Sequence, residues 1–336
     1  MSKKQLAQEY PPLNEQAFTQ DLAERLKAKI IQDNPTGIMR RDAHLKMHGV
    51  VKAEFIIEPD LPEQLRIGIF KQPRIFPAWI RFSNANSDIG PDIRRGIRGM
   101  AIKVMNVEGD KILAGEKHEA TQDFLLISMN VFLTKDVKQF DDLTKAFTGS
   151  MLSKIVFFVC HLRVIRNVFW SMKKFANPLQ IRYWSTTPYL FGNAAVKYSA
   201  IPHVKAADSI PDNPDDDFLR NAMIRQLAKE AAVFDFAVQF QTDAEKMPIE
   251  DPGREWSETA SPFRKVATIR IFPQHFDDEQ QRQFGENLSF TPWHSLPEHR
   301  PLGGINRARQ FIYQIISTFR HAKNNVPMKE PTSFEI

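Results

Sequence analysis

Eight runs rich in β-branched and aromatic residues, spread between residues 49 and 272, constrain the fold of this chain more than any other feature. Several of these runs alternate apolar and polar residues, which is typical of strands that bury one face. An open sheet leaves unpaired backbone groups at its edges, whereas a closed barrel has no edges. We therefore predict an eight-stranded antiparallel β-barrel. Its strands would be 49–57, 65–70, 77–83, 99–107, 123–129, 194–201, 232–241 and 264–272.

Helical segments are expected on both sides of the strand region and within it. Residues 14–33 carry apolar side chains at helical spacing and end before Pro35. We expect one α+β domain, in which 1–35 form an N-terminal helix or arm, 36–273 a barrel with helical insertions, and 274–336 the C-terminal helices. The tail from residue 324 should be extended. The other predicted helices are 135–147, 150–175, 217–229, 277–287 and 303–321.

Composition excludes several classes of protein. The 336 residues carry a formal net charge of +5 that is not concentrated in a tail, so we expect no nucleic-acid partner. A lone cysteine, Cys160, cannot form an intrachain disulfide. Residues 1–10 lack the apolar stretch of a signal peptide, and no uncharged apolar run reaches the roughly 18 residues of a membrane span. The chain is therefore expected to be cytoplasmic.

The last predicted helix has an unusual polar face. Arg309, Tyr313 and Arg320 fall within roughly 40° of one another at about 100° per residue. A guanidinium beside a phenol favours the phenolate, which is an anionic ligand suited to ferric iron and a known axial ligand of haem. The alternative is a surface tyrosine between two solvated arginines.

Two N-terminal segments favour the haem-ligand interpretation of Tyr313 over the surface tyrosine. An Arg-x-x-His turn ends at His44, and an Arg-Phe-Ser strand ends at Ser83. A third motif, Arg-x-x-x-Tyr, ends at Tyr313 within the last predicted helix. The three motifs occur in the same order as in the haem catalase superfamily, which the chain resembles over about residues 36–322. The stretches 289–294 and 298–303 are similar to its small catalase-related branch. The resemblance implies a minimal catalase-like core with haem b and without an NADPH domain.

The resemblance also implies a role for each matching residue on the distal side. His44 would be the distal acid and base, because a neutral imidazole can take a proton from a peroxide and return it. Ser83 would bind one ring nitrogen of His44 and so fix which nitrogen is free. His48 lies four residues further on and is a competing candidate, although the family motif places the histidine three residues after the arginine.

On the proximal side, the resemblance makes Tyr313 the axial ligand of the haem iron. Arg309 would stabilise its phenolate. Arg41, Arg81 and Arg320 would bind the two haem propionates, because buried carboxylates need forked cationic donors.

One departure from the catalase pattern bears on the reaction. Large catalases carry a distal Asn that orients a second peroxide, and the ungapped match places Thr121 there, with Gln122 beside it. The phenylalanine that packs over the haem becomes Leu125. We therefore predict a peroxidase-like enzyme with weak catalase activity. It would reduce hydrogen peroxide or organic hydroperoxides, including lipid hydroperoxides, with a small-molecule electron donor.

Residues 155–174 suggest a contact with a membrane surface. Arg163, Arg166, Lys173 and Lys174 share one helical face, and apolar side chains occupy the other. Such a basic amphipathic helix can lie on an anionic bilayer, which would make the protein peripherally membrane-associated. The alternatives are a helix packed on the barrel with a solvated basic face, or a contact between two copies.

Two other functions are compatible with the same resemblance. Allene oxide synthases share the fold and rearrange fatty-acid hydroperoxides, but they place a threonine just before the distal histidine, where this chain has Ala43. The second is a haem-binding protein without catalysis, which would not need a positioned base. Large catalases are tetramers held partly by arms absent here, so we expect a monomer or homodimer.

Overall fold

The computed structural model describes residues 4–204 and 207–336, so the first three residues of the predicted N-terminal arm lie outside it. Its strands form one antiparallel sheet in the order β5-β4-β3-β2-β1-β9-β8-β7-β6. β5 pairs with both β4 and β7 and closes a ring of eight strands, while β6 follows β7 at the end of this order. The strands are β1 (Met47–Ile57), β2 (Ile75–Asn84), β3 (Arg98–Met105), β4 (Thr121–Ile127), β5 (Tyr183–Trp184), β6 (Tyr189–Phe191), β7 (Ala194–Pro202), β8 (Ala232–Phe240) and β9 (Arg264–Ile271).

The predicted α+β fold with a closed eight-stranded barrel is confirmed, but one predicted strand is wrong. Residues 65–70 lie in a turn region with two short 3₁₀ helices, Glu63–Leu65 and Gly68–Phe70. Gly68 has a φ of +55°, which is incompatible with a strand. The strand that takes its place in the ring is β5, whose two residues are too few to show a period.

Most of the predicted helices are present. They are α1 (Glu15–Asp33), α2 (Val137–Thr148), α5 (Phe218–Leu227), α6 (Glu279–Asn287) and α7 (Gly304–Asn324). The helical block predicted over 150–175 forms two helices, α3 (Met151–Cys160) and α4 (Leu162–Ser171). His161 breaks the helix between them: its ring stacks on Phe157 at 4.3 Å, and its Nδ1 lies 2.7 Å from the Phe157 carbonyl oxygen.

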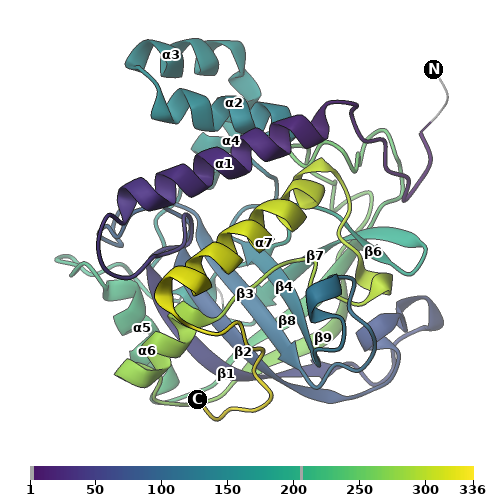
Figure 1. Cartoon of the computed structure of the whole chain (residues 1–336). Coiled ribbons are helices and arrows are strands. Elements are labelled where there is room, and N and C mark those ends of the chain that lie inside the picture. Colours follow the sequence, from purple (N-terminus) through teal and green to yellow (C-terminus); the bar gives the residue numbers. More distant parts are fainter. Residues whose placement is uncertain (1–3, 205–206) are drawn as a thin grey trace.

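Aromatic side chains fill the barrel interior. Phe55 stacks on Phe124 at 5.9 Å and meets the ring of Phe236 edge-on at 5.0 Å, and all three are buried. Such pairs add to the stabilisation from apolar burial. A second apolar cluster lies outside the barrel, where α1, α2 and α7 pack together. Figure 1 shows α7 crossing in front of β3 and β4, with α1 next to α7.

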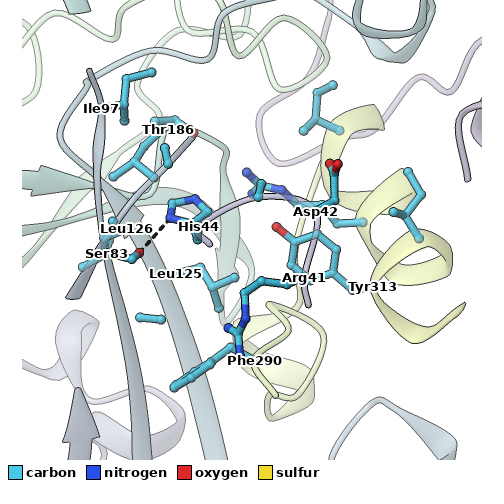
Figure 2. Close-up of a pocket in the computed structure, with 18 of the residues that line it drawn as sticks. Arg41, Asp42, His44, Ser83, Ile97, Leu125, Leu126, Thr186, Phe290 and Tyr313 are labelled. Carbon is cyan, nitrogen blue, oxygen red and sulfur yellow. Dashed lines mark hydrogen bonds between the residues drawn. The ribbon is translucent and has the colours of Figure 1, made fainter. Parts of the chain in front are cut away.

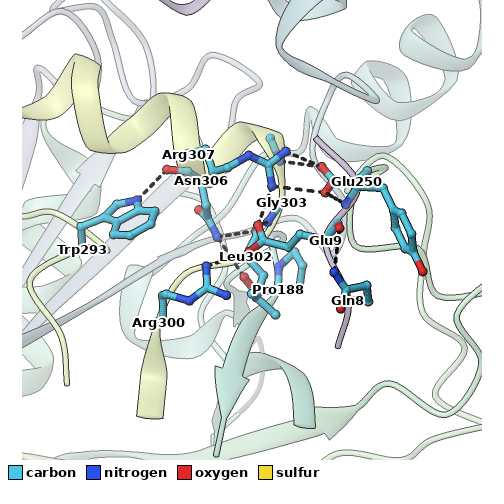
Figure 3. A network of polar contacts seen from close by, with 12 residues as sticks. Gln8, Glu9, Pro188, Glu250, Trp293, Arg300, Leu302, Gly303, Asn306 and Arg307 are labelled. Atoms are coloured by element: carbon cyan, nitrogen blue, oxygen red, sulfur yellow. Dashed lines mark hydrogen bonds and ion pairs between the residues drawn. The ribbon is translucent and has the colours of Figure 1, made fainter. Parts of the chain in front are cut away.

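A cluster of ion pairs holds the start of α7 (Figure 3). The Arg307 guanidinium bonds to Glu9, to both oxygens of Glu15 at 2.6 and 2.7 Å, and to Glu250 Oε2 at 2.7 Å. Burial opposes the charged guanidinium, but its bonds to Glu15 and Glu250 raise the pKa of Arg307 above its usual value. Three carboxylates from distant segments therefore converge on one cation.

Backbone conformation and a buried amide complete this anchor. Gly303 has a φ of +84°, and a Cβ there would lie 2.5 Å from the carbonyl oxygen of Ile249. Asn306 is fully buried and donates from Nδ2 to the carbonyls of Pro188 and Leu302 at 2.9 and 3.1 Å. Because α7 carries the predicted residues 309, 313 and 320, these contacts fix the position of those residues relative to the barrel.

We expect Arg307→Met to destabilise the fold by about 2 kcal/mol or more at neutral pH, because Glu15 and Glu250 lose their cation and Glu9 keeps only Arg300. Thermal melting should show a clearly lower melting temperature for Arg307→Met than for the control Arg254→Met. The Arg254 side chain is 57% exposed and makes a surface ion pair with Asp251. Equal melting temperatures for the two variants would contradict the anchor.

The loss of folding stability caused by Arg307→Met should become smaller below about pH 4.5. Burial alone would raise the pKa of Glu9, but its bonds from Gly303 and Arg300 and the charge of Arg307 lower it. In the native protein, the stability that Glu9 contributes is therefore lost as the pH falls through this lowered pKa. In the variant, the unpaired carboxylates accept protons more readily, so acid reduces their repulsion.

Candidate functional site

A cavity of about 470 Å³ lies between the outer face of the barrel and the helices. That volume is in the range of small-molecule and cofactor sites, about 300–1,000 Å³. Along β2, β3 and β4 the side chains alternate, so that one set fills the barrel core and the other faces the cavity. Residues from β2–β4 that face the cavity include Arg81, Ser83, Gly99, Ala101 and Leu125, and those from α7 include Ile305, Ile312, Tyr313 and Arg320.

His44 projects into the cavity from the turn before β1, and its Nδ1 lies 2.9 Å from Ser83 Oγ (Figure 2). Its backbone is in the left-handed region, at φ +59°, and its carbonyl accepts a bond from Arg81 Nη2 at 3.0 Å. A Cβ on Gly99 would lie 2.4 Å from the His44 ring. The turn, the arginine and the glycine thus fix the ring against Ser83.

The electrostatics of the cavity keep His44 neutral. Burial, followed by the charges of Arg81, Arg41 and Arg309, lowers the pKa of His44 to about 3. A neutral imidazole has one N–H and one lone pair, so it can both donate and accept a proton. His48, the competing candidate, does not line the cavity; it is buried and bonds through Nε2 to Asn84 Oδ1 at 2.8 Å.

Tyr313 reaches into the cavity from α7. Figure 2 shows its ring on the helix side, with the hydroxyl directed toward the side from which His44 and Leu125 project. Within the described part of the chain, that hydroxyl has no hydrogen-bond partner. Arg309 also lines the cavity, but it donates to Thr187 Oγ1 and Asn306 Oδ1, each at 3.2 Å, and not to Tyr313. The effect of Arg309 on the phenol therefore stays a prediction.

Arg41, Arg81 and Arg320, which come from three distant segments, meet at one edge of the cavity around Glu286. The Glu286 carboxylate lies 3.7 Å from Arg41 Nε, 3.9 Å from Arg81 Nη2 and 3.2 Å from Arg320 Nη1. Arg41 and Arg320 also donate to the Glu286 carbonyl at 2.8 and 2.7 Å. Glu286 at the end of α6 is therefore the shared counterion of the predicted propionate-binding arginines.

This edge of the cavity carries three cations and one anion, which leaves a surplus of two positive charges. Burial and the neighbouring Arg41 lower the pKa of Arg320 to about 9 in spite of Glu286, and the same causes lower the pKa of Arg81. Like charges held this close raise the energy of the empty site. A ligand with two carboxylates would supply the missing negative charge, so the arrangement fits the haem that the sequence predicts.

The predicted place of Thr121 is wrong, because Thr121 does not line the cavity. It lies on the same face of β4 as Leu125 but four residues earlier, roughly 13 Å along the strand. Its hydroxyl lies 2.5 Å from both Glu330 Oε2 and His294 Nε2. Gln122 faces the opposite side and is fully buried. The cavity wall near His44 is mainly apolar, with Ile97, Leu125, Leu126 and Met129, and its polar members include Asn86 and Thr186.

Sequence reasoning missed three residues of the site. Glu286 had no visible signal, because its partners lie in three distant segments. The close approach at Gly99 follows from its register opposite Ser83, which appears only in the structure. Thr186 lines the cavity with a φ of +58° and a buried hydroxyl that has no partner in the described chain. Such backbone strain in a β-branched residue is uncommon and concentrates at functional sites.

Among the comparisons with known proteins, the one with solved structures shows the fold. No protein-family model and no curated protein matches the sequence. A fungal catalase superposes with a TM-score of 0.70 at 18% identity, over 96% of this chain and 66% of its own. A bacterial catalase gives 0.67 at 18% identity, over 100% and 68%. Catalase A from Saccharomyces cerevisiae gives 0.69 at 17% identity, over 95% and 67%. The chain thus has the catalase fold and spans about two thirds of the length of these catalases.

Proposed function

We propose that the protein is a haem-dependent peroxidase that reduces hydrogen peroxide or organic hydroperoxides. The observation that supports this most directly is the pair formed by His44 with Ser83 on one side of the cavity and the unpartnered hydroxyl of Tyr313 on the other. Tyr313 would hold the iron, the apolar walls would enclose the macrocycle, and Arg41, Arg81 and Arg320 would bind the propionates. When bound, haem would supply a redox-active iron for the reduction of a peroxide.

In this proposal, His44 moves one proton. Its free nitrogen would accept the proton of the peroxide and return it to the leaving oxygen, which would depart as water or an alcohol. Ser83 holds the other nitrogen. A pKa of about 3 makes a weak base, but the arginines contribute to that low value. Two propionates beside Arg81 and Arg41 would offset their charge and raise the pKa of His44 toward its usual range.

The distal wall favours peroxidase chemistry over disproportionation. Most of its side chains are apolar, Leu125 among them, and they accept an apolar peroxide readily; the one amide of the described lining is Asn86, which lies in a different segment from the strand β4 that carries the catalase-like run. A small-molecule donor would then supply the two electrons of each turnover. The same wall suits rearrangement of a fatty-acid hydroperoxide, and the product formed without any reductant distinguishes the two reactions.

Tyr313→Phe should abolish stable haem ligation, because it removes the oxygen proposed to bind the iron. Haemin added to the purified wild type should give a high-spin ferric spectrum, which the variant should lack. Tyr10→Phe, at an exposed site 42% accessible to solvent, is the control and should behave as the wild type. A wild type that binds no haemin while soluble and folded would contradict the proposal.

His44→Ala should bind haemin normally but cleave peroxide about 10²–10⁴-fold more slowly, because the proton-transfer group is lost. Stopped-flow absorbance of the haem-loaded protein measures the step. Ser83→Ala should reduce the rate of peroxide cleavage by a smaller factor, because it removes only the hydrogen bond that orients the His44 ring. Wild-type rates in His44→Ala would exclude this residue as the acid and base.

Glu286→Gln should increase haem affinity by roughly tenfold, because the propionates would no longer compete with a carboxylate for charge-assisted bonds. Without haem, the variant should melt at a lower temperature, since three arginines lose their anion. Absorbance titration with haemin measures the first effect. Glu279→Gln, on the same helix and 86% exposed, is the control. Weaker haem binding by Glu286→Gln would show that the arginines do not bind the propionates.

A further inference from the structure

The helices α3 and α4 form a pair that stands away from the barrel. Figure 1 shows α3 beyond α2, at the end of the molecule farthest from the strands. In α3 only Phe157 is buried, although almost every residue of the helix is apolar. We call residues 147–174 the helical pair. A helix that is apolar all round and yet exposed needs another surface to cover it.

The exposed apolar side chains of the protein concentrate on this pair. Of the 21 large apolar side chains exposed in the described chain, ten lie between residues 147 and 170, so this surface is a patch and not a scatter. Several are more than two thirds exposed. The ten are Phe147, Met151, Leu152, Ile155, Val156, Val159, Leu162, Ile165, Phe169 and Trp170.

The charge around this patch is of one sign. The sequence has no Asp or Glu from residue 143 to residue 207. Arg166, Lys173 and Lys174 are exposed, and none of them has a carboxylate partner within the described residues. Several acidic groups on elements that contact the helical pair are already paired.

Those paired acidic groups belong to α2 and to the loop before β9. Asp141 binds Arg25 and Lys145, Asp142 binds Lys138, and Asp251 binds Arg163 with both oxygens. The basic side chains at positions 166, 173 and 174 therefore remain available to an external anion.

We propose that the helical pair binds the surface of an anionic lipid bilayer. Aromatic and aliphatic side chains would enter the boundary between headgroups and acyl chains, while Arg166, Lys173 and Lys174 meet the lipid phosphates. Within the described residues, no helix is long and apolar enough to cross a bilayer. Helices of ten residues with this composition suit a position in the plane of the surface.

A second copy of the chain fits this surface less well. A two-fold interface pairs each surface with itself, so it would bring the unpaired cations at 166, 173 and 174 of both copies together. Anionic lipid provides the opposite charge. Self-association is therefore an outcome that the experiment must distinguish.

Docking in this way would place the cavity next to the bilayer. Met172, which directly follows α4, and Phe140 on α2 both line the cavity. Hydroperoxides of membrane lipids would then be the substrate class, an extension that rests on the proposed function. Binding to vesicles does not depend on haem, so failure of one proposal would leave the other intact.

Flotation of the full-length protein with vesicles tests the proposal. The wild type should float with mixed phosphatidylglycerol–phosphatidylcholine vesicles and not with pure phosphatidylcholine. Lys173→Glu/Lys174→Glu should weaken the binding by roughly thirtyfold or more, because four units of charge change at the surface. Phe169→Ser/Trp170→Ser, at positions 72% and 68% exposed, should also weaken it without unfolding the protein.

Matched controls separate docking from net charge and from solubility. Lys71→Glu/Lys229→Glu changes the net charge equally at exposed sites elsewhere and should float as the wild type. Ile75→Ser/Ile89→Ser removes apolar side chains that are 58% and 56% exposed outside the patch. Equal binding to both vesicle types, or equal loss in the controls, would overturn the proposal. A wild type that binds no vesicle would also overturn it. If that wild type is a dimer and Phe169→Ser/Trp170→Ser is a monomer, the helical pair is an interface between two copies instead.

Discussion

The alternation of side chains along β2, β3 and β4 is the constraint on which both the core and the cavity depend. Phe82, Ile102 and Phe124 point into the barrel, whereas Arg81, Ser83, Ala101 and Leu125 beside them line the cavity. A slip of one residue would exchange the two sets and destroy both. The burial of aromatic rings in the barrel therefore also holds Arg81 and Ser83 at the cavity.

The sequence predicted the fold well where a period was long enough to read. Seven strands and α7 were identified because each presents several repeats of its apolar pattern. β5 was missed because two residues carry no period, and 65–70 were misread because an apolar run in a buried turn looks like a buried strand. The break at His161 depends on a ring that stacks on Phe157, which no local propensity indicates.

The candidate site was partly predictable for a different reason. His44, Ser83 and Tyr313 belong to motifs with fixed spacing, so their presence in one cavity could be expected before the structure was known. Thr121 was misplaced because an ungapped match ignores how far along a strand a residue lies. Glu286 could not be foreseen, because its position is set only when α6 packs beside the arginines. Long-range electrostatics left no trace in the local sequence.

The closure of the barrel has a consequence for the cavity wall. Only three residue pairs join β5 to its two neighbours, whereas the pairings along β1 and β2 run for nearly the whole strand. Ser185 and Thr186, which follow β5 directly, belong to the cavity lining. The seam of the barrel and the wall of the site are thus the same short piece of chain. A substitution that disturbs the pairing of β5 would therefore also displace part of the cavity wall.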